Sequence, residues 1–334
     1  MTLDRKSFVR ALGGALISAA LAVMACRAEA QTSSQAWPAR TITAISPIGA
    51  GNAVDIVGRV ILDQMSKQLG VPIIVENRPG GGGLIGFNDV ARAKPDGYTV
   101  LLGSSTISSG AVLHKALPYD PVKDFAAVVP FGVSPSVLVV APSKGFNSVA
   151  DLVAAAKARP GALNYASAGI GAASHIAAER FRVAAGINAQ HVPFRGPAEA
   201  LGEVVAGRVD YYFLPLAAGI SLIQSGKLKA LAVSTPKRSA LMPDVPTIAE
   251  AGYPTAEYLF WGGLFVPAKV PSDIVTRLYD EGRKAIDLPA TQSALTKVGY
   301  EPLRLTPAEF QAFFVKDFNE TVALAKQVGI VPGD

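Results

Sequence analysis

The sequence predicts an α/β protein in which mainly parallel sheets are flanked by helices. Its 334 residues are 50% apolar and 17% charged, enough to bury a sizeable core, and a chain of this length suggests about two domains. Short runs of β-branched residues alternate with amphipathic stretches of helical length, beginning in the order strand, helix, strand, helix, strand. This alternation favours parallel strands connected by helices.

The first part of the chain supplies one series of elements. We expect strands and helices in turn at 41–46, 53–69, 72–75, 84–93 and 99–103. The helix at 53–69 carries apolar residues at helical spacing from Val54 to Leu69, and Gly70 is its expected stop. A Lys-Pro-Asp-Gly turn at 94–97 introduces the last of these strands.

The middle of the chain repeats the pattern. We expect further strands at 137–141, 163–167, 190–192, 209–214 and 228–234. Ser148 and Asp151 form a capping box that opens a helix to about Arg159. Another helix begins near Ser174, directly after a glycine-bearing turn.

Two helix starts mark the C-terminal part, at Ser272-Asp273 and at Thr306-Pro307-Ala308-Glu309. The second combines an N-cap Thr, a Pro at the first helical position and a Glu that completes a capping box. Four phenylalanines follow it at near-helical spacing, at positions 310, 313, 314 and 318. We interpret this stripe as core or domain packing and not as a cofactor site.

The first 30 residues have the pattern of a secretory signal peptide. Three basic residues precede an apolar run at 11–25, and Ala28-Glu29-Ala30 offers a small-residue cleavage site. The run is shorter than the roughly 20 residues that a membrane-spanning helix needs. We expect cleavage after Ala30 and a soluble, periplasmic mature protein. Lipid attachment at Cys26 is the alternative.

Cysteine, histidine and charge exclude several classes of function. One Cys cannot form a disulfide framework, and His114, His175 and His191 lie far apart without the short spacings of metal ligands. The formal net charge is +5, part of it in the leader, and the chain has no basic runs with interleaved aromatics. We therefore expect no metal, no cofactor and no nucleic-acid partner.

Three glycine-bearing turns are candidates for anion binding, at 47–52, 78–83 and 167–174. Each leaves the carboxyl end of a predicted strand and opens a helix, where unpaired main-chain N–H groups and the helix dipole favour an anion. Two such turns facing each other would clamp a carboxylate without a charged side chain. The alternative is that the glycines only permit tight turns.

Other polar residues near these turns have two interpretations each. Ser104, Ser105 and Thr106 follow a strand end and either add hydroxyl donors or form a self-satisfied turn. Asp55 lies in a first helical turn, where it either complements the dipole or contacts a ligand. Asp210 is either a turn cap or a ligand contact.

Enzyme signatures are incomplete, so we expect no catalytic residue. Ser167 lies in Tyr-Ala-Ser-Ala-Gly, which resembles a nucleophile elbow but lacks the first glycine, and no His has an obvious general-base context. His175 is interpreted as a structural or rim residue. Ser234-Thr235-Pro236-Lys237 matches S-x-x-K, but Pro236 stands where that motif is helical. No phosphate-binding loop or dinucleotide fingerprint is present.

Eight short motifs in order resemble the Bug family of periplasmic solute-binding proteins, the receptors of tripartite tricarboxylate transporters. They extend over nearly the whole mature chain: Trp37-Pro38-Ala39-Arg40, Pro47–Asp55, Glu76–Gly80, Lys94–Thr99, Tyr165–His175, His191–Gly196, Leu228–Thr235 and Asp244–Thr247. The family loop after Pro47 usually has an aromatic residue and a Gly-Gly pair. Ile48 and Gly51-Asn52 stand there in this chain.

The resemblance implies a two-lobed, type II-like Venus-flytrap fold that closes on a small carboxylate. Lobe 1 would comprise 31–136 and 257–334, and lobe 2 would comprise 137–256. The contacts implied in lobe 1 are Ser46, Pro47, Gly49, Ala50, Gly51, Asn52, Asp55, Ser104, Ser105 and Thr106. Those implied in lobe 2 are Ser167, Ala168, Gly169, Ser174, Phe194 and Asp210.

The expected function is capture of a small carboxylate and its delivery to the membrane permease subunits of a tripartite tricarboxylate transporter. We expect a monomer. One alternative is a sensor of the same fold that reports ligand binding to a signalling partner. The other is a periplasmic serine-dependent hydrolase with Ser167 as nucleophile.

Overall fold

The computed structural model describes residues 37–330. The predicted signal peptide at 1–30, its cleavage site and Cys26 lie outside the described residues. Within residues 37–330, none of the helices is both long enough and apolar enough to cross a membrane.

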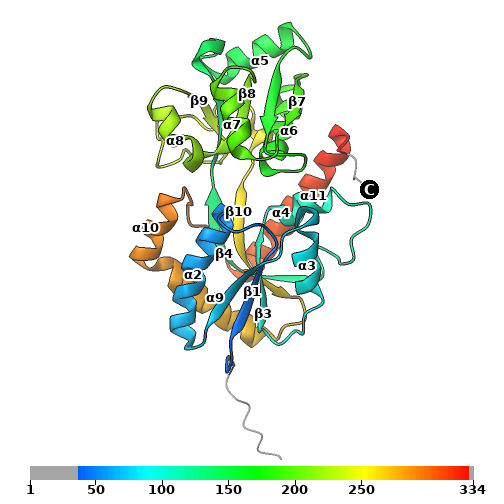
Figure 1. The fold of residues 1–334 in the computed structure, drawn as a ribbon, viewed down its shortest axis with the longest axis vertical. Coiled ribbons are helices and arrows are strands. Elements are labelled where there is room, and N and C mark those ends of the chain that lie inside the picture. Colours follow the sequence, from blue (N-terminus) through cyan, green and yellow to red (C-terminus); the bar gives the residue numbers. More distant parts are fainter. Residues whose placement is uncertain (1–36, 331–334) are drawn as a thin grey trace, which may run out of the picture. The chain divides into compact units, whose positions relative to one another are not determined.

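The described chain forms two five-stranded sheets (Figure 1). The first has the order β2 (Ile73–Asn77), β1 (Ile42–Ser46), β3 (Thr99–Ser104), β10 (Phe260–Pro267) and β4 (Phe125–Ser134). The second has the order β7 (Gln190–Pro193), β6 (Asn164–Ser167), β8 (Tyr211–Pro215), β5 (Ser136–Val140) and β9 (Lys229–Val233).

Each sheet contains a single reversed strand. β10 is antiparallel to β3 and β4, and β5 is antiparallel to β8 and β9, while the other pairs are parallel. Four of the five strands in each sheet therefore point the same way, which confirms the predicted mainly parallel α/β fold.

The reversed strands show how the chain passes between the sheets. β4 leaves the first sheet and continues after Pro135 as β5 of the second, and the chain returns from β9 to β10. A strand that enters a sheet from its carboxyl edge must run against the strands already there. The carboxyl edges of both sheets therefore face the crossings, and ligands of open α/β sheets bind at this edge.

Helices flank both sheets (Figure 1). The helices that follow first-sheet strands are α2 (Ala53–Leu69), α3 (Leu84–Ala91), α4 (Thr106–Ala111), α9 (Ser272–Asp287), α10 (Pro289–Lys297) and α11 (Pro307–Val328). Those of the second sheet are α5 (Val149–Ala158), α6 (Ala173–Ala185), α7 (Pro197–Val205) and α8 (Leu216–Gln224). Short 3-10 turns are η1 (Gly81–Gly83), η2 (Pro142–Lys144) and η3 (Pro254–Ala256).

Each predicted strand and helix is present, with its ends displaced by at most a few residues. Gly70 ends α2 in the left-handed conformation with φ 73°. Both predicted capping boxes are formed, Ser148 with Asp151 at α5 and Thr306 with Glu309 at α11. These helix ends depend on a few neighbouring residues, so they could be predicted from the sequence.

The two long strands β4 and β10 were not predicted from the sequence. β4 contains Pro130 and Gly132, and β10 contains the pair Gly262-Gly263, which interrupt the usual strand pattern. Both strands are almost entirely buried, so neither shows an alternation of polar and apolar residues. The glycine at 263 has a packing role, because a Cβ there would lie 2.5 Å from the Phe310 ring.

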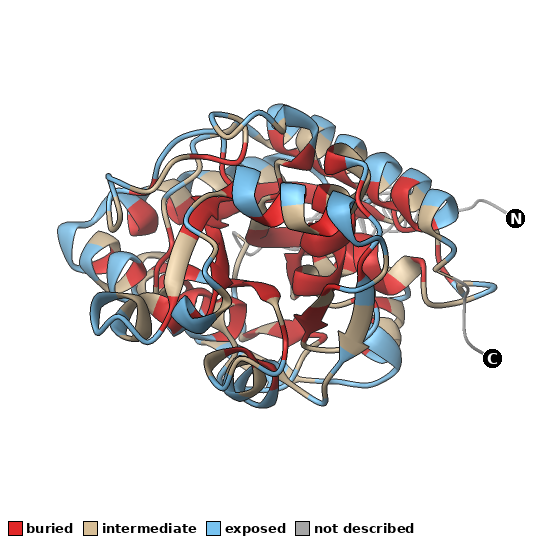
Figure 2. Ribbon diagram, turned by 90° about the horizontal axis from the view of Figure 1, so that it is seen from above, coloured by how far each residue is buried: buried red, intermediate tan, exposed pale blue. Residues whose placement is uncertain are grey.

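Clusters of buried apolar residues form a core at each sheet and hold it to its helices, and Figure 2 shows the strands as mostly buried. Phe310 and Phe314 are fully buried in the first core, where the Phe310 ring packs edge-on against Trp261 at 5.6 Å. This confirms that the phenylalanine stripe serves core packing. Further along the same helix, Leu324 belongs to the core cluster of the second sheet. α11 therefore touches both cores.

Candidate ligand-binding site

Three buried serines end three parallel strands. Ser46 is the last residue of β1, Ser104 of β3 and Ser167 of β6, and all three are fully buried. The predicted turn at 47–52 begins directly after Ser46, and the predicted turn at 167–174 begins at Ser167. Ser46 and Ser104 therefore lie at the carboxyl edge of the first sheet, and Ser167 lies at the carboxyl edge of the second.

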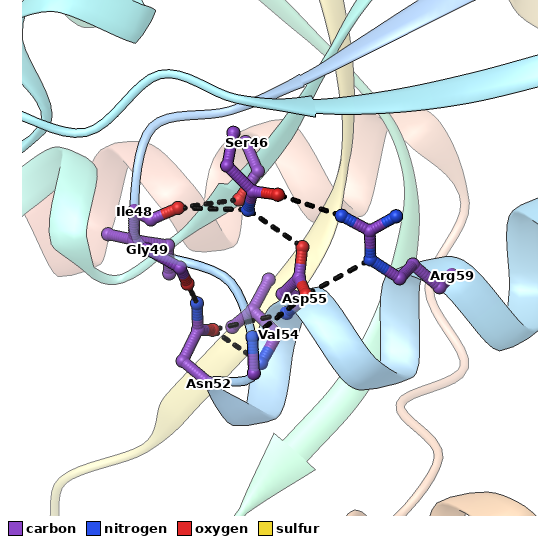
Figure 3. A network of polar contacts seen from close by, with 9 residues as sticks. Ser46, Ile48, Gly49, Asn52, Val54, Asp55 and Arg59 are labelled. Carbon is purple, nitrogen blue, oxygen red and sulfur yellow. Dashed lines mark hydrogen bonds and ion pairs between the residues drawn. The ribbon is translucent and has the colours of Figure 1, made fainter.

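The first turn, residues 47–52, is held by the side chains of its own Asn52 and of Asp55 in α2 (Figure 3). Asn52 is the N-cap of α2, and its Oδ1 accepts from the N–H groups of Val54 at 3.0 Å and Asp55 at 3.1 Å. The Asn52 amide also donates to the carbonyl of Gly49. The Asn52 side chain thus ties the turn to the helix start.

The side chain of Asp55 also holds this turn in place. Its carboxylate is 2% exposed and accepts from the Gly51 N–H at 3.0 Å, from Asn77 Nδ2 at 2.8 Å and from Arg59 Nε at 3.1 Å. Burial opposes ionisation, but the hydrogen bonds from Arg59, Gly51 and Asn77 together outweigh it and lower the pKa of Asp55. These contacts favour a structural role for Asp55 over the ligand contact that was the other interpretation.

The remaining donors of the first turn are main-chain amides. Gly51, expected to be one of them, gives its N–H to Asp55. Within residues 37–330 the N–H groups of Gly49, Ala50, Asn52 and Ala53 have no acceptor. Gly49 and Ala50 are exposed, and Asn52 and Ala53 are half-buried. These four groups are therefore available to a ligand.

The second turn, residues 167–174, uses more of its own amides than expected. The Ala168 N–H donates to Ser174 Oγ at 3.0 Å, and the Gly169 N–H donates to Ser167 Oγ at 3.1 Å. These two amides therefore already have acceptors within their own turn. In the described chain, the N–H groups of Ile170, Ala173 and Ser174 are the ones without an acceptor, so the available donors lie nearer the first turn of α6.

Two polypeptide segments pack against the second turn. Phe194 donates its N–H to the Ser167 carbonyl at 3.0 Å, so it stays with the candidate site. Leu113, which follows α4 at the first sheet, packs so closely that a Cβ on Gly171 would lie 2.8 Å from its side chain. The second turn therefore touches an element of the first sheet.

The glycine turn at 78–83 serves packing. All four residues from Gly80 to Gly83 have positive φ, between 56° and 134°. His114 Nε2 lies 2.7 Å from the Gly81 carbonyl, and a Cβ on Gly110 of α4 would lie 2.5 Å from the Gly82 carbonyl. The glycines allow this turn to lie directly on α4, which supports the tight-turn interpretation here.

The hydroxyls after β3 mainly satisfy one another. Ser104 Oγ and Thr106 Oγ1 are 2.7 Å apart, and the Thr106 N–H points to Ser104 Oγ at 3.3 Å. Ser105 donates its N–H to the Trp261 carbonyl and receives the Tyr258 hydroxyl at 3.4 Å. Thr106 is the half-buried member of the three.

Asp210 does not join the other candidate residues. It precedes Tyr211, and Tyr165 pairs with Tyr211 in register, so Asp210 lies at the amino edge of the second sheet. Its carboxylate accepts from the Asn164 N–H at 2.8 Å and pairs with Lys144 Nζ at 2.7 Å. These contacts fit the turn-cap alternative and give no support to a ligand contact.

Two histidines support the second turn, His175 in the structural role that was one of its interpretations and His191 in a contact that was not predicted. His191 Nε2 lies 2.6 Å from Ser167 Oγ, and His175 Nδ1 accepts from the Gly171 N–H at 3.0 Å. No His has an obvious general-base context in the sequence, but the structure places His191 beside Ser167. Parallel pairing of β6 with β7 brings His191 opposite Tyr165, a contact that only the strand register reveals.

The described residues contain no gathering of three or more His, Cys, Asp or Glu side chains that could hold a metal ion. The candidate site thus consists of main-chain amides, serine and threonine hydroxyls and the amide of Asn52. Such a set binds anions through hydrogen bonds and helix dipoles.

Comparisons with known proteins agree with this architecture. The family model described as the tripartite tricarboxylate transporter family receptor matches residues 57–330. Protein BugT of Bordetella pertussis is 32% identical over 302 residues, which is 90% of this chain and 93% of BugT.

Two similar solved structures contain carboxylates. One is described as R. palustris Rpa4515 with adipate, with 32% identity, a TM-score of 0.76 and coverage of 89% of this chain and 100% of that one. The other is MatC from Rhodopseudomonas palustris with bound malate, with 30% identity, a TM-score of 0.73 and coverage of 86% and 99%.

Fold and comparisons together define a solute-binding protein of the periplasmic binding protein class. The chain belongs to the tripartite tricarboxylate transporter family of receptors, which confirms the resemblance to the Bug family.

Proposed function

We propose that this protein is a periplasmic receptor that binds a small organic carboxylate and delivers it to the permease subunits of a tripartite tricarboxylate transporter. One observation carries the proposal: α2 and α6 both begin at a carboxyl edge with unpaired N–H groups, at Asn52 and Ala53 and at Ala173 and Ser174. The adipate and malate in the two similar structures support the ligand class.

We divide the candidate residues into those that can meet the ligand and those that hold the turns in shape. At the first sheet the residues that can meet the ligand are Ser46, Pro47, Gly49, Ala50, Asn52, Ala53 and Thr106, with Gly51, Asp55, Ser104 and Ser105 holding their shape. At the second sheet they are Ile170, Ala173 and Ser174, with Ser167, Ala168, Gly169 and Phe194 holding theirs. Each helix start supplies N–H donors and the positive end of a dipole to one carboxylate group.

Two lobes joined by the crossings at 134–136 and 234–259 would close on the ligand. We place lobe 1 at 31–136 and 257–334 and lobe 2 at 137–256, and we propose that the receptor acts as a monomer. Closure would remove water from the donors, so that a ligand without matching acceptors would leave buried N–H groups unpaired. This cost gives selectivity for acids over alcohols and amides of the same length.

Proline at the first helical position provides a direct test. Ala53 and Ala173 occupy this position in α2 and α6, and the preceding residues have extended φ and ψ of −75° and 165° and of −63° and 156°. Proline is compatible with that geometry and removes only one N–H. Serine at the same position keeps the N–H and is the matched control.

The measurement is calorimetry of residues 31–334 with adipate, malate and the uncharged 1,6-hexanediol. Each proline variant should weaken binding of the diacid about tenfold, as expected for one hydrogen bond to a charged group, and each serine variant should bind within about threefold of wild type. Equal affinities for proline and serine variants, or binding of the diol and not of any acid, would refute the proposed site.

A serine hydrolase is the second candidate, because Ser167 and His191 are within hydrogen-bond distance. Three features count against it. Ser167 is fully buried, and its Oγ already forms hydrogen bonds within its own turn. Within residues 37–330, no carboxylate forms a hydrogen bond with His191. Turnover of a p-nitrophenyl ester that disappears in Ser167→Ala would establish the hydrolase instead.

A further inference from the structure

Four stacked rings lie behind the second turn. The imidazoles of His175 and His191 are 3.9 Å apart and nearly parallel, at 7°. Tyr165 stacks on His191 at 4.9 Å and on Tyr211 at 5.5 Å. His175 is 4% exposed, and both tyrosines are fully buried. Neither imidazole is assigned a role by the proposed function.

Each imidazole makes one hydrogen bond to the turn. The Gly171 N–H can only donate, so His175 Nδ1, 3.0 Å away, carries no proton. The neutral form of His175 must therefore hold its proton on Nε2. His191 Nε2 meets Ser167 Oγ at 2.6 Å, at the other end of the turn.

Ionisable groups around the pair come from three elements. Glu179 of α6 accepts from the Tyr165 hydroxyl of β6 and pairs with Arg182 at 2.7 Å, and Tyr211 of β8 completes the set. Burial and then the neighbouring His191 lower the pKa of His175 to about 4, with Arg182 adding to this and Glu179 opposing it. Burial also lowers the pKa of His191, against Glu179. Both rings are therefore neutral at pH 7.

We propose that His175 and His191 are positioning residues of the ligand site: as a neutral stacked pair they hold Gly171 N–H and Ser167 Oγ, and so leave the amides of Ile170, Ala173 and Ser174 to the ligand. The inference rests on the proposed function for its ligand. In this role the two imidazoles do not touch the ligand. They keep the turn in one hydrogen-bonded state before the ligand binds.

Protonation gives this role a signature. A proton on His175 Nδ1 would face the Gly171 N–H with a second donor, and the hydrogen bond would be lost. The charged ring would also lie 3.9 Å from the second imidazole in a buried place. The turn should therefore change conformation when His175 is protonated, which a purely space-filling ring would not cause.

Two substitutions separate hydrogen bonding from packing. In His175→Asn the side-chain oxygen can take the place of Nδ1 and cannot titrate, whereas His175→Leu fills space without an acceptor. At pH 8 we expect His175→Leu to bind adipate about tenfold more weakly than wild type, as for the loss of one buried hydrogen bond. His175→Asn should restore most of the affinity. Equal weakening in both variants would overturn the proposal.

The pH profile is read from the Gly171 amide in ¹⁵N-labelled, ligand-free protein. Its chemical shift should titrate with a midpoint near pH 4 in wild type and stay constant in His175→Asn. A Gly171 signal that titrates equally in both proteins, or in neither, would overturn the proposal. This readout needs no ligand, so it remains decisive even if adipate fails to bind, which would count against the proposed function alone.

Discussion

The buried carboxylate of Asp55 offers the sharpest test of how the first turn is held. Asp55→Ala removes an acceptor that serves Gly51, Asn77 and Arg59. A hydrogen bond to a charged group contributes roughly 1.5–3 kcal/mol. The Arg59 side chain is 45% exposed and Gly51 is exposed, so these two donors regain water. We therefore expect the free energy of unfolding to fall by about 3 kcal/mol.

The assay is urea unfolding of residues 31–334 at pH 7, with Asp63→Ala as the control in the same helix. Asp63 pairs with Lys67 at 2.7 Å, but both side chains are about two-thirds exposed, so this variant should lose less than about 0.5 kcal/mol. Calorimetry on the folded variants should show that Asp55→Ala also weakens binding of adipate, because the Gly51 N–H loses the carboxylate that holds the turn in place.

The stabilisation contributed by Asp55 should depend on pH in a definite direction. The pKa of Asp55 is lowered in the folded protein, so its stabilisation is complete above the unfolded value of about 3.9 and is lost as the pH falls through the folded value. The difference between wild type and Asp55→Ala should shrink below pH 4. A loss below about 1 kcal/mol at pH 7, or equal losses in Asp55→Ala and Asp63→Ala, would refute this reasoning.

Three further predictions concern the turns at 47–52, 167–174 and 78–83, one for each turn. Asn52→Ala removes the N-cap of α2 and should lower the free energy of unfolding by about 1 kcal/mol, measured by urea unfolding beside Asn52→Asp, which keeps the cap. The pKa of His175 is lowered to about 4, so protonation favours the unfolded chain: stability should be complete above pH 6.5 and fall by up to about 3 kcal/mol towards pH 4, a slope that His175→Asn should lack. Gly81 has φ 56°, so Gly81→Val should lower the melting temperature by several degrees, in line with a cost of roughly 2 kcal/mol, whereas Gly196→Ala, with φ 179° and open space around it, should not.

Much of the fold was predictable because its signals are local. The α2 helix from Ala53 to Leu69 has an apolar stripe and a glycine stop within its own sequence. The strands β4 and β10 were missed because burial on both faces removes the alternation that marks a strand. β10 is itself the reversed strand of the first sheet, and β4 leads into β5, the reversed strand of the second, so the two reversals were not predicted either.

The strand ends and helix starts around the candidate site were predictable from the sequence, but the hydrogen bonds of its turns were not. The sequence by itself determined which turns follow strand ends and where helices begin, since strand ends, caps and glycines are properties of a few neighbouring residues. Only the tertiary structure decided that Gly51 donates to Asp55, that His175 takes the Gly171 amide and that Asp210 lies at the far edge. A main-chain N–H can donate to any acceptor that lies close enough. Strand register and helix packing decide which acceptors lie close to it.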